Sequence, residues 1–211
     1  RVHPPAARGG RLGAIETDAG PLAADRFVFA AGAWLPGLFA EPLGPRVFPT
    51  RQEVFFFATP PGDDRFGLDR MPVWLDGDFY GIPDLEARGF KVACDRHGEA
   101  FDPEGGDRLP TRAAFETVRA HLARRFPALA DAPLSEARVC VYENSAGGDL
   151  LVDRHPELED VWLVGCGSGH GFKHAPAVGS HAARLVLEGR GTDQPRLAFA
   201  GKGATHRRSV R

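Results

Sequence analysis

Four glycines alternate with other residues in one short stretch of the chain, GCGSGHGFKHAP, which runs from Gly165 to Pro176. An apolar run precedes the stretch and an amphipathic segment follows it, so the pattern predicts a strand, a tight turn and the start of a helix. Backbone N–H groups are unpaired at such a helix start, and they favour an anion or a flat ligand close to the main chain. A tight turn that only packs a helix against a sheet is the alternative.

The spacing of these glycines excludes two phosphate-binding motifs. After Gly167 and Gly169, a dinucleotide fingerprint needs a third glycine where this chain has Phe172. A P-loop needs Gly-Lys followed by Ser or Thr, and the chain reads Gly-Phe-Lys. His170 and Lys173 are the side chains of the stretch that suit ligand binding, and a structural histidine and a surface lysine are their alternatives.

Four further residues are candidates because of their type and position. Lys91 lies between apolar residues in a strand-like segment, so it either faces solvent or is buried for a purpose. Cys140 lies in another such segment, where an isolated cysteine is normally an inert small hydrophobe. Tyr80 and Tyr142, the two tyrosines of the chain, combine an apolar ring with a polar tip. Such rings suit an alkylated amine, or equally a buried site with one hydrogen bond.

The composition is ordinary for a soluble globular chain of 211 residues, with 43% hydrophobic and 26% charged residues and a net charge of -2. This charge gives no reason to expect nucleic acid or an acidic membrane as a partner, and no apolar run approaches the roughly 18 residues of a membrane span. Three widely spaced cysteines argue against disulfides and zinc, so we expect no metal and a reducing, cytoplasmic location. A basic cluster near the end predicts a disordered tail: Lys202, His206, Arg207, Arg208 and Arg211.

The candidate residues must be positioned by a mixture of strands and helices. An antiparallel block in the middle of the chain is bracketed by strand–helix units, which predicts an α+β fold with one domain inserted into another. In the helix expected at 110–126, the predicted buried face is the stripe Phe115, Val118, Leu122 and Phe126. The arginines outside this stripe, Arg119, Arg124 and Arg125, predict a solvated face. The helix expected at 172–187 has one apolar face, formed by Phe172, Ala175, Val178, Ala182, Ala183 and Val186. Strands are expected at 11–17, 26–30 (paired with 11–17 through a turn), 47–59, 73–75, 79–82, 90–94, 138–142 and 161–164.

Three motifs together resemble the sarcosine oxidase family, flavin-dependent amine oxidases of the D-amino-acid-oxidase-like group. They are GSGHGFK at 167–173, VCVY at 139–142 and DRHP at 153–156. The segments FVFAAGAW at 27–34, RQ at 51–52, YGIP at 80–83 and GFK at 89–91 extend the resemblance in order from about residue 11 to residue 190.

The resemblance implies the remainder of a Rossmann-like FAD-binding domain enclosing an antiparallel-sheet substrate domain. Its parts are a partial FAD-binding domain at 1–44, a substrate-binding sheet plus helix at 45–138, a return to the FAD-binding domain at 139–190 and a tail at 191–211. The 211 residues contain no G-x-G-x-x-G fingerprint, with which family members hold the FAD diphosphate. The chain therefore resembles the C-terminal portion of such an enzyme, and the first residue, Arg1, fits that expectation.

The resemblance also implies roles for the candidate residues. Gly169, His170, Gly171 and Phe172 are expected to bind the isoalloxazine of FAD, where backbone N–H groups stabilise negative charge on the reduced ring. Lys173 is expected to pair with the substrate carboxylate, and His170 to shape the pocket or donate a hydrogen bond.

In the other segments, Lys91 is expected near flavin N5, where a cation assists the reaction with oxygen. Cys140 is expected to form a thioether with the flavin 8α-methyl, and Tyr80 and Tyr142 to face the substrate. Asp153–Pro156 is expected to organise a turn beside the flavin.

The implied reaction oxidises a secondary or primary amine, such as an N-methyl amino acid, to an imine, with oxygen reduced to hydrogen peroxide. Two alternatives stay open. One is a dehydrogenase with another electron acceptor, which Lys91 disfavours. The other is an incomplete or non-catalytic chain that needs a separate nucleotide-binding half.

Overall fold

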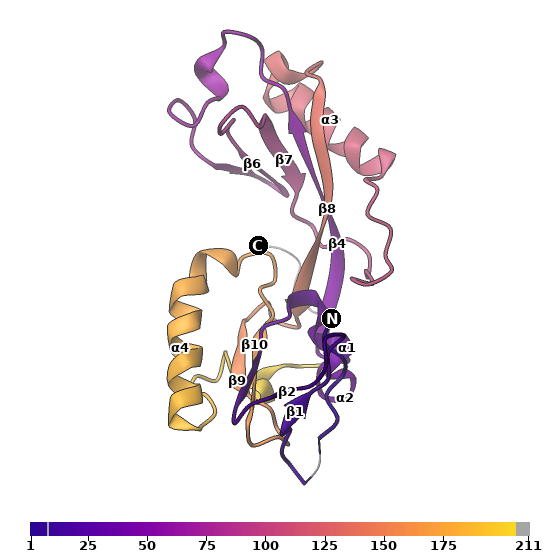
Figure 1. Ribbon diagram of the computed structural model, residues 1–211. Coiled ribbons are helices and arrows are strands. Elements are labelled where there is room, and N and C mark those ends of the chain that lie inside the picture. Colours follow the sequence, from indigo (N-terminus) through magenta and orange to yellow (C-terminus); the bar gives the residue numbers. More distant parts are fainter. Residues whose placement is uncertain (8, 206–211) are drawn as a thin grey trace. The chain divides into compact units, whose positions relative to one another are not determined.

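The computed structural model describes residues 1–7 and 9–205, and the chain divides into two compact units (Figure 1). The first unit contains Arg1–Thr50, Asp102–Glu104 and the described residues from Tyr142 onward. The second contains Arg51–Phe101 and Gly105–Val141. The domain assignment expected from the sequence stays a prediction. In the described residues, no helix is long and apolar enough to cross a membrane.

The first unit is built around a three-stranded sheet in the order β3-β10-β9. β3 and β10 are parallel, with Val28 opposite Trp162, whereas β10 and β9 are antiparallel, with Leu163 opposite Asp153. The first three residues of β10 are buried, which explains their unbroken apolar sequence. The strands of this unit, with the separate ribbon β1-β2, are β1 (Ala14–Ile15), β2 (Leu22–Ala23), β3 (Phe27–Phe29), β9 (Leu151–Arg154) and β10 (Val161–Gly165).

The hairpin expected between 11–17 and 26–30 is wrong in its partner. β1 pairs with β2, and β3 pairs in parallel with β10. The reason is the burial of the alternate residues Phe27 and Phe29, which draws β3 into the core sheet.

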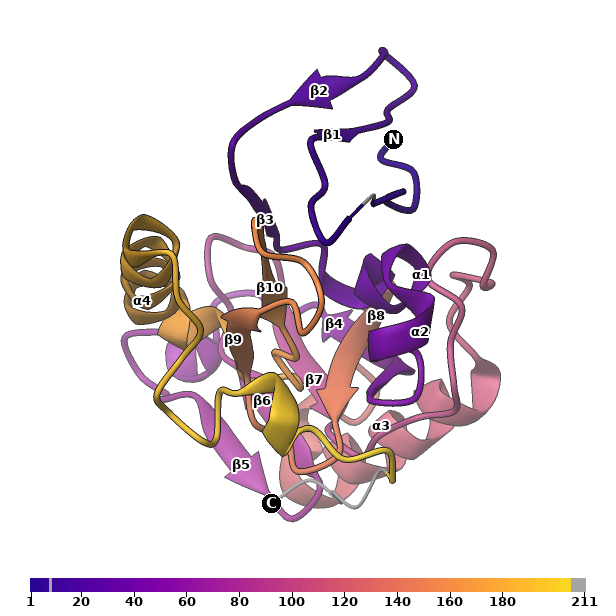
Figure 2. The ribbon, with the colours of Figure 1, turned by 90° about the horizontal axis from the view of Figure 1, so that it is seen from below.

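Helical elements flank this sheet, and α4 lies alongside β9 and β10 (Figures 1 and 2). α4 ends at Gly189, whose φ of 68° closes the helix in the left-handed conformation. The helical elements are η1 (Gly32–Trp34), α1 (Leu35–Leu38), α2 (Ala40–Leu43), η4 (Phe172–His174), α4 (Ala175–Glu188) and η5 (Phe199–Gly201).

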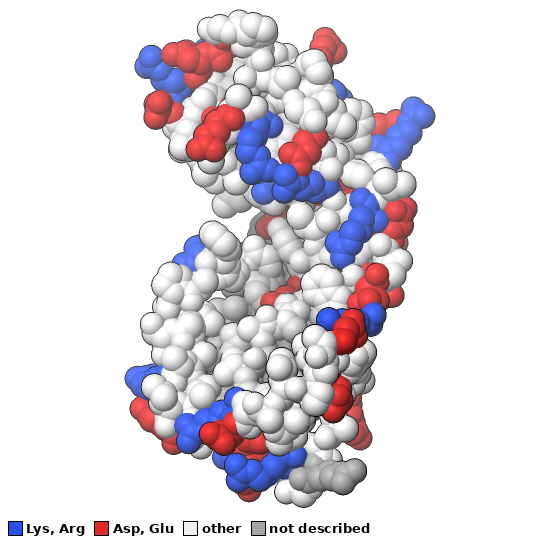
Figure 3. Space-filling model, in the orientation of Figure 1, with Lys and Arg blue, Asp and Glu red and all other residues white. Residues whose placement is uncertain are grey.

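The buried face of α4 agrees with the expected one at Ala182 and differs from it at the start of the helix. Ala182 and Leu185 are buried with Val152 and Trp162. Phe172, which was expected on this face, is 97% exposed because it lies in the 3-10 turn before the helix. The outward surface of α4 carries few charged side chains (Figure 3).

The segment after α4 is fixed to the first unit by the carboxylate of Asp153. Its Oδ1 accepts the N–H groups of Arg154 and Thr192, and its Oδ2 accepts that of Phe199, each at 2.8 Å. Lys202, expected in a disordered tail, is instead buried and donates to the carbonyl of Arg196. The other basic residues of the expected tail lie at 206–211, outside the described residues.

The second unit contains a five-stranded sheet in the order β5-β6-β7-β4-β8. The pairs β5·β6, β6·β7 and β7·β4 are antiparallel, as the hairpin-like spacing predicted. β4 begins in the first unit and ends in the second, whereas β8 begins in the second and ends in the first. The strands are β4 (Val47–Phe57), β5 (Trp74–Asp76), β6 (Phe79–Ile82), β7 (Phe90–Cys94) and β8 (Leu134–Ser145).

The helix of the second unit, α3 (Arg112–Arg125), packs its predicted stripe into the core of that unit. Thr111 caps its start by accepting the N–H of Ala114 at 3.2 Å. Arg119, expected on a solvated face, instead lies over the rings of Phe57 and Phe115. It donates to two carbonyls of the following loop, which fix the guanidinium there. The short helices are η2 (Asp64–Phe66) and η3 (Pro127–Leu129).

His121 on α3 is an aromatic member of this core. Its ring stacks on Phe79 at 3.9 Å and lies near Trp74 at 5.7 Å between centroids. Burial lowers the pKa of His121, the Asp76 carboxylate raises it, and the Arg124 and Arg125 guanidinium groups lower it further. The folded second unit therefore favours the neutral imidazole.

This environment makes the stability of the second unit sensitive to acid. Because the folded pKa of His121 lies below the ordinary 6.5, its contribution is complete above that pH and is lost as the pH falls toward the folded pKa. We expect His121→Phe, which keeps the ring stacking, to lose less free energy of unfolding between about pH 8 and pH 5 than the wild type. Urea titrations at a series of pH values measure this. The exposed variant His3→Gln is the control, and identical profiles for His121→Phe and wild type would contradict the assignment.

Candidate functional site

The glycine run follows β10 and forms a turn with unusual backbone conformations. Cys166 has a φ of 59°, Ser168 of 47° and Gly169 of 78°. The first two are costly for residues that carry a Cβ, on the order of 1–3 kcal/mol each. Strain of this kind persists only where the surroundings impose it, and it is commonly found at functional sites.

The end of β8 holds this turn in place. Glu143 accepts the N–H of Gly167 on Oε1 and the N–H of Ser168 on its backbone carbonyl, both at 3.2 Å. Ser145 donates its N–H to Oγ of Ser168 at 3.2 Å, and that hydroxyl donates to the carbonyl of Cys166 at 3.1 Å. Cys166 is fully buried beneath the turn.

Two of the glycines are required by close packing. A Cβ on Gly169 would lie 2.5 Å from the ring of Tyr142, and one on Gly171 would lie 2.9 Å from the Cα of Gly167. Tyr142, one of the predicted substrate residues, therefore packs directly on the run. Close packing within the protein therefore explains at least part of the need for glycine at these two positions, whether or not the run also binds a ligand.

The outer part of the run presents free hydrogen-bond donors to solvent. Among the described residues, the backbone N–H groups of Gly169, Gly171, Phe172 and Lys173 have no acceptor. The Lys173 side chain is exposed and forms no ion pair within the described residues. These donors and this cation suit a ligand with acceptor atoms or negative charge.

His170 lies in the same turn. Its Nε2 is 3.0 Å from the carbonyl of Gly148, so the ring is held as a donor from that nitrogen. The ring lies edge-on to His174, with the centroids 6.1 Å apart. This contact supports a structural role for His170, because one ring nitrogen already has a hydrogen-bond partner within the protein.

In the second unit, Lys91, Tyr80 and Cys140 lie together. The Nζ of Lys91 lies over the ring of Tyr80, 5.2 Å from its centroid. Lys91 and Cys140 both line a pocket of about 240 Å³, together with Arg88 and Arg138. Burial lowers the pKa of Lys91, Cys140 raises it, and Arg138 and Arg88 lower it again. The pocket therefore has an excess of positive charge.

Cys140 itself is half-buried beside Val54, Phe56 and Ala93. Arg138 was a candidate to promote its thiolate. The Arg138 guanidinium is an ion-pair partner of Glu136, and its positive charge is partly offset there. The inert alternative for Cys140 thus remains open beside the predicted flavin linkage.

The expected turn at Asp153–Pro156 is only partly a turn. Asp153 and Arg154 end β9, and the turn follows at His155. The buried His155 accepts the N–H groups of Glu157 and Leu158 on Nδ1, and burial lowers its pKa. This imidazole is a neutral structural acceptor.

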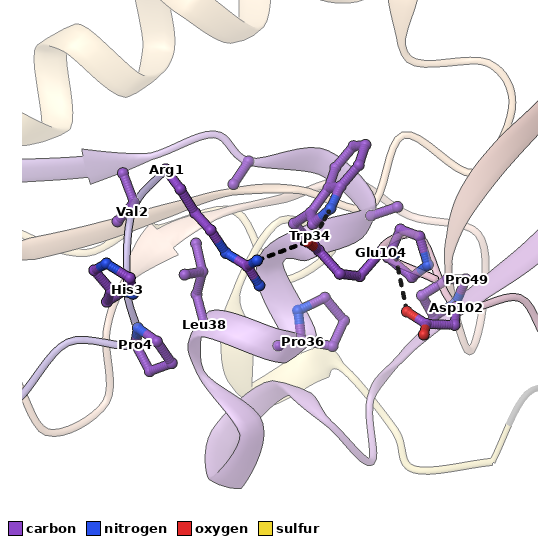
Figure 4. Close-up of a pocket in the computed structure, with 14 residues that line it drawn as sticks. Arg1, Val2, His3, Pro4, Trp34, Pro36, Leu38, Pro49, Asp102 and Glu104 are labelled. Atoms are coloured by element: carbon purple, nitrogen blue, oxygen red, sulfur yellow. Dashed lines mark hydrogen bonds and ion pairs between the residues drawn. The ribbon is translucent and has the colours of Figure 1, made fainter. Parts of the chain in front are cut away.

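Sequence reasoning missed Glu143, because a single glutamate in a strand has no distinctive pattern. It also missed a cavity of about 790 Å³ in the first unit, beside η1 (Figure 4). There Glu104 accepts from the Trp34 indole at 3.2 Å and pairs with Arg1 at 2.8 Å. The described residues contain no group of three or more His, Cys, Asp or Glu side chains arranged for a metal ion.

The strained turn gives a direct test of the run's geometry. We expect Gly169→Ala to cost about 1–3 kcal/mol of unfolding free energy, because it combines a positive φ with overlap against the Tyr142 ring. Gly179→Ala in α4 is the matched control: nothing lies within 4 Å of its Cβ, so alanine should stabilise the helix by about 0.5–1 kcal/mol. Chemical denaturation of both variants measures the difference, and equal stabilities would refute the described turn.

Known proteins resemble this chain over most of its length. Monomeric sarcosine oxidase of Streptomyces avermitilis is 33% identical over 183 residues, covering 83% of this chain and 47% of that protein. N-methyl-L-tryptophan oxidase of Salmonella arizonae is 29% identical, covering 82% and 46%. The crystal structure of fructosamine oxidase (Amadoriase II) from Aspergillus fumigatus superimposes with a TM-score of 0.83 at 24% identity, over 99% of this chain and 50% of that one.

The chain thus spans about half the length of the curated relatives it matches. The α+β expectation is confirmed as a mixture of helix and sheet in a fold shared with fructosamine oxidase, while the Rossmann-like remainder stays a prediction. The model of the DAO family, FAD dependent oxidoreductase, matches residues 3–185. The resemblance noted in the sequence is therefore confirmed, and the chain belongs to the DAO family of FAD-dependent oxidoreductases.

Proposed function

We propose that this chain is part of an FAD-dependent oxidase of amino-acid-like amines, in which the glycine run contacts the flavin. The observation that carries the proposal is the set of free backbone N–H groups on the run. When bound, FAD would accept two electrons from the amine, leaving an imine, and oxygen would reoxidise it with formation of hydrogen peroxide. The protein's part is to bind, orient and supply charge.

The residues of the run fit a flavin. The run carries unpaired N–H groups at its exposed turn, and the exposed Phe172 offers an apolar surface at the same turn. The free N–H groups can stabilise negative charge on the ring without having to reorganise. We propose Gly169, His170, Gly171 and Phe172 as the cofactor-binding residues. His170, with Nε2 engaged by the Gly148 carbonyl, would orient the turn or face the ligand with its ring.

No residues in this chain fit the FAD diphosphate, because the 211 residues lack the G-x-G-x-x-G fingerprint. We propose that a nucleotide-binding half outside these residues holds it. The alternative is that the chain by itself is non-catalytic.

The substrate is proposed from the chemistry that the relatives' names share: sarcosine, N-methyl-L-tryptophan and fructosyl amines are all substituted amines. Lys173 is exposed and free to pair with a carboxylate. Tyr142 and Tyr80 would present ring surface to an alkylated amine. No strong base is required among the described residues if the amine binds in its neutral form.

Lys91 is proposed to assist the reaction with oxygen, because its ammonium is a half-buried cation in a pocket with two arginines. Cys140 is proposed to form a thioether with the flavin 8α-methyl. That bond replaces one S–H and one C–H bond, and the two electrons and two protons released would pass to oxygen.

Flavin binding tests the proposal most directly. The chain is purified alone and after co-expression with a half that carries the dinucleotide fingerprint, and each sample is examined for flavin absorbance and for peroxide formation with N-methyl amino acids. We expect a yellow, active complex with the added half. Acid precipitation then tests Cys140, since colour in the pellet indicates covalent attachment and colour in the supernatant excludes it. A colourless complex would favour the non-catalytic alternative.

Lys91→Met should separate the two half-reactions. We expect reoxidation by oxygen to slow by at least about 100-fold, while reduction by substrate changes little, because the cation acts on charge that develops with oxygen. The wild-type oxygen rate should fall as the pH rises, starting below the ordinary lysine pKa of 10.5, because burial lowers the pKa of Lys91 and its cation is lost earlier. Stopped-flow traces measure both rates, and equal losses in the two half-reactions would exclude the role. Unimpaired turnover with a carrier in place of oxygen would favour a dehydrogenase.

Lys173→Ala should raise KM for carboxylate substrates by about 30-fold or more, which corresponds to losing a charge pair worth roughly 2–5 kcal/mol. KM for an uncharged amine should stay the same. Arg184→Ala, at an exposed position on α4, is the control for a lost surface cation. An unchanged KM for the carboxylate substrate would rule out this pairing.

A further inference from the structure

Glu143 places a carboxyl group directly beneath the glycine run. Its Oε1 accepts the N–H of Gly167 at 3.2 Å. A Cβ on Gly165 would lie 3.0 Å from Oε2, and one on Gly167 would lie 3.5 Å from Oε1. The carboxyl therefore fills the space that these two glycines leave open, and it lies within one residue of the strained positions Cys166 and Ser168.

The second oxygen of this carboxyl has no partner. Oε2 is sealed from solvent and accepts no hydrogen bond from the described residues, none of which forms an ion pair with Glu143. An ionised carboxylate in such a place would be an uncompensated buried charge, which is strongly disfavoured. A neutral acid lowers that cost, because burying an unpaired O–H group is far less unfavourable than burying an unpaired charge, while Oε1 still accepts the N–H of Gly167.

Burial of the carboxyl favours its neutral form. Burial raises the pKa of Glu143, against the opposing effect of the Gly167 and Cys166 N–H groups. In the run itself, burial and the Glu143 carboxyl raise the pKa of the Cys166 thiol to about 12. From the segment after α4, the Lys202 ammonium lowers the pKa of that thiol. Burial lowers the pKa of Lys202, and the Asp149 and Asp153 carboxylates in turn raise it. Leu35 of α1, which meets Gly165 from the other side, adds no charge.

We propose that Glu143 is a positioning residue held as the neutral acid beneath the run, and that its ionisation switches off the run's affinity for an anionic ligand such as reduced flavin. A carboxylate at this point would cancel the positive ends of the backbone N–H groups that lie above it. A glutamine would hold Gly167 equally well, and it would never ionise. This inference rests on the proposed flavin site.

The experiment compares wild type, Glu143→Gln and the exposed control Glu188→Gln in the flavin-bound complex across alkaline pH. In the wild type and the control, we expect the affinity for reduced over oxidised FAD to fall by at least about tenfold as Glu143 ionises, which lowers the midpoint potential by about 30 mV for a two-electron couple. Glu143→Gln should lack this additional fall while binding oxidised FAD as tightly as the wild type. A pH profile of Glu143→Gln that coincides with wild type would overturn the proposal.

A second measurement does not depend on flavin. Infrared difference spectra of the chain, wild type minus Glu143→Gln, should contain the C=O band of a protonated carboxyl at neutral pH that disappears at alkaline pH. Its absence at neutral pH would overturn the proposal even if Glu143→Gln were too unstable for potentiometry. If the band is present and no flavin binds, the proposed function fails. If flavin binds and the potentials of wild type and Glu143→Gln coincide, the proposed function stands and the switch is excluded.

Discussion

The turn after β10 must keep its backbone N–H groups unpaired while two of its non-glycine residues hold positive φ values. The second condition is unfavourable for an isolated loop, because left-handed residues that carry a Cβ cost energy. Strand β8 holds the turn in this conformation, because Glu143 and Ser145 at its end form hydrogen bonds with the inner half of the turn. Since β10 is itself fixed between β3 and β9, the outer half of the turn faces solvent from a rigid base.

The two units offer different ways to stabilise negative charge. In the first unit the run offers backbone dipoles, which carry no proton of their own. In the second unit, Lys91 is a cation whose charge depends directly on pH, because burial and two arginines lower its pKa. Backbone dipoles suit a negative charge that persists, whereas a titratable cation suits a negative charge that forms in a single step.

The sequence predicted those parts of the fold and site in which one residue pattern dominates. The stripe on α3 and the strands β5, β6 and β7 follow from periodicity, and the glycine run marks its own turn. The parallel pairing of β3 with β10 could not be predicted, because it joins segments more than 130 residues apart that carry no mutual signal. Glu143 and the Asp153 anchor were missed for a similar reason: each acts through backbone N–H groups, which every sequence has. Family resemblance suggested the roles proposed for Lys91, Cys140 and Lys173, which spacing alone left open.

The passage of β4 and β8 from one unit to the other has a consequence for recombination between related proteins. Two of the places where the chain changes unit, Thr50–Arg51 and Val141–Tyr142, lie inside two hydrogen-bonded neighbouring strands. A chimera that exchanged the second unit would be cut within these strands, and one inserted or deleted residue would turn every later side chain to the opposite face. On β8 such a shift would move Tyr142 and Glu143 away from the glycine run. Exchange of the second unit between relatives is therefore tolerated only where both strands keep their register.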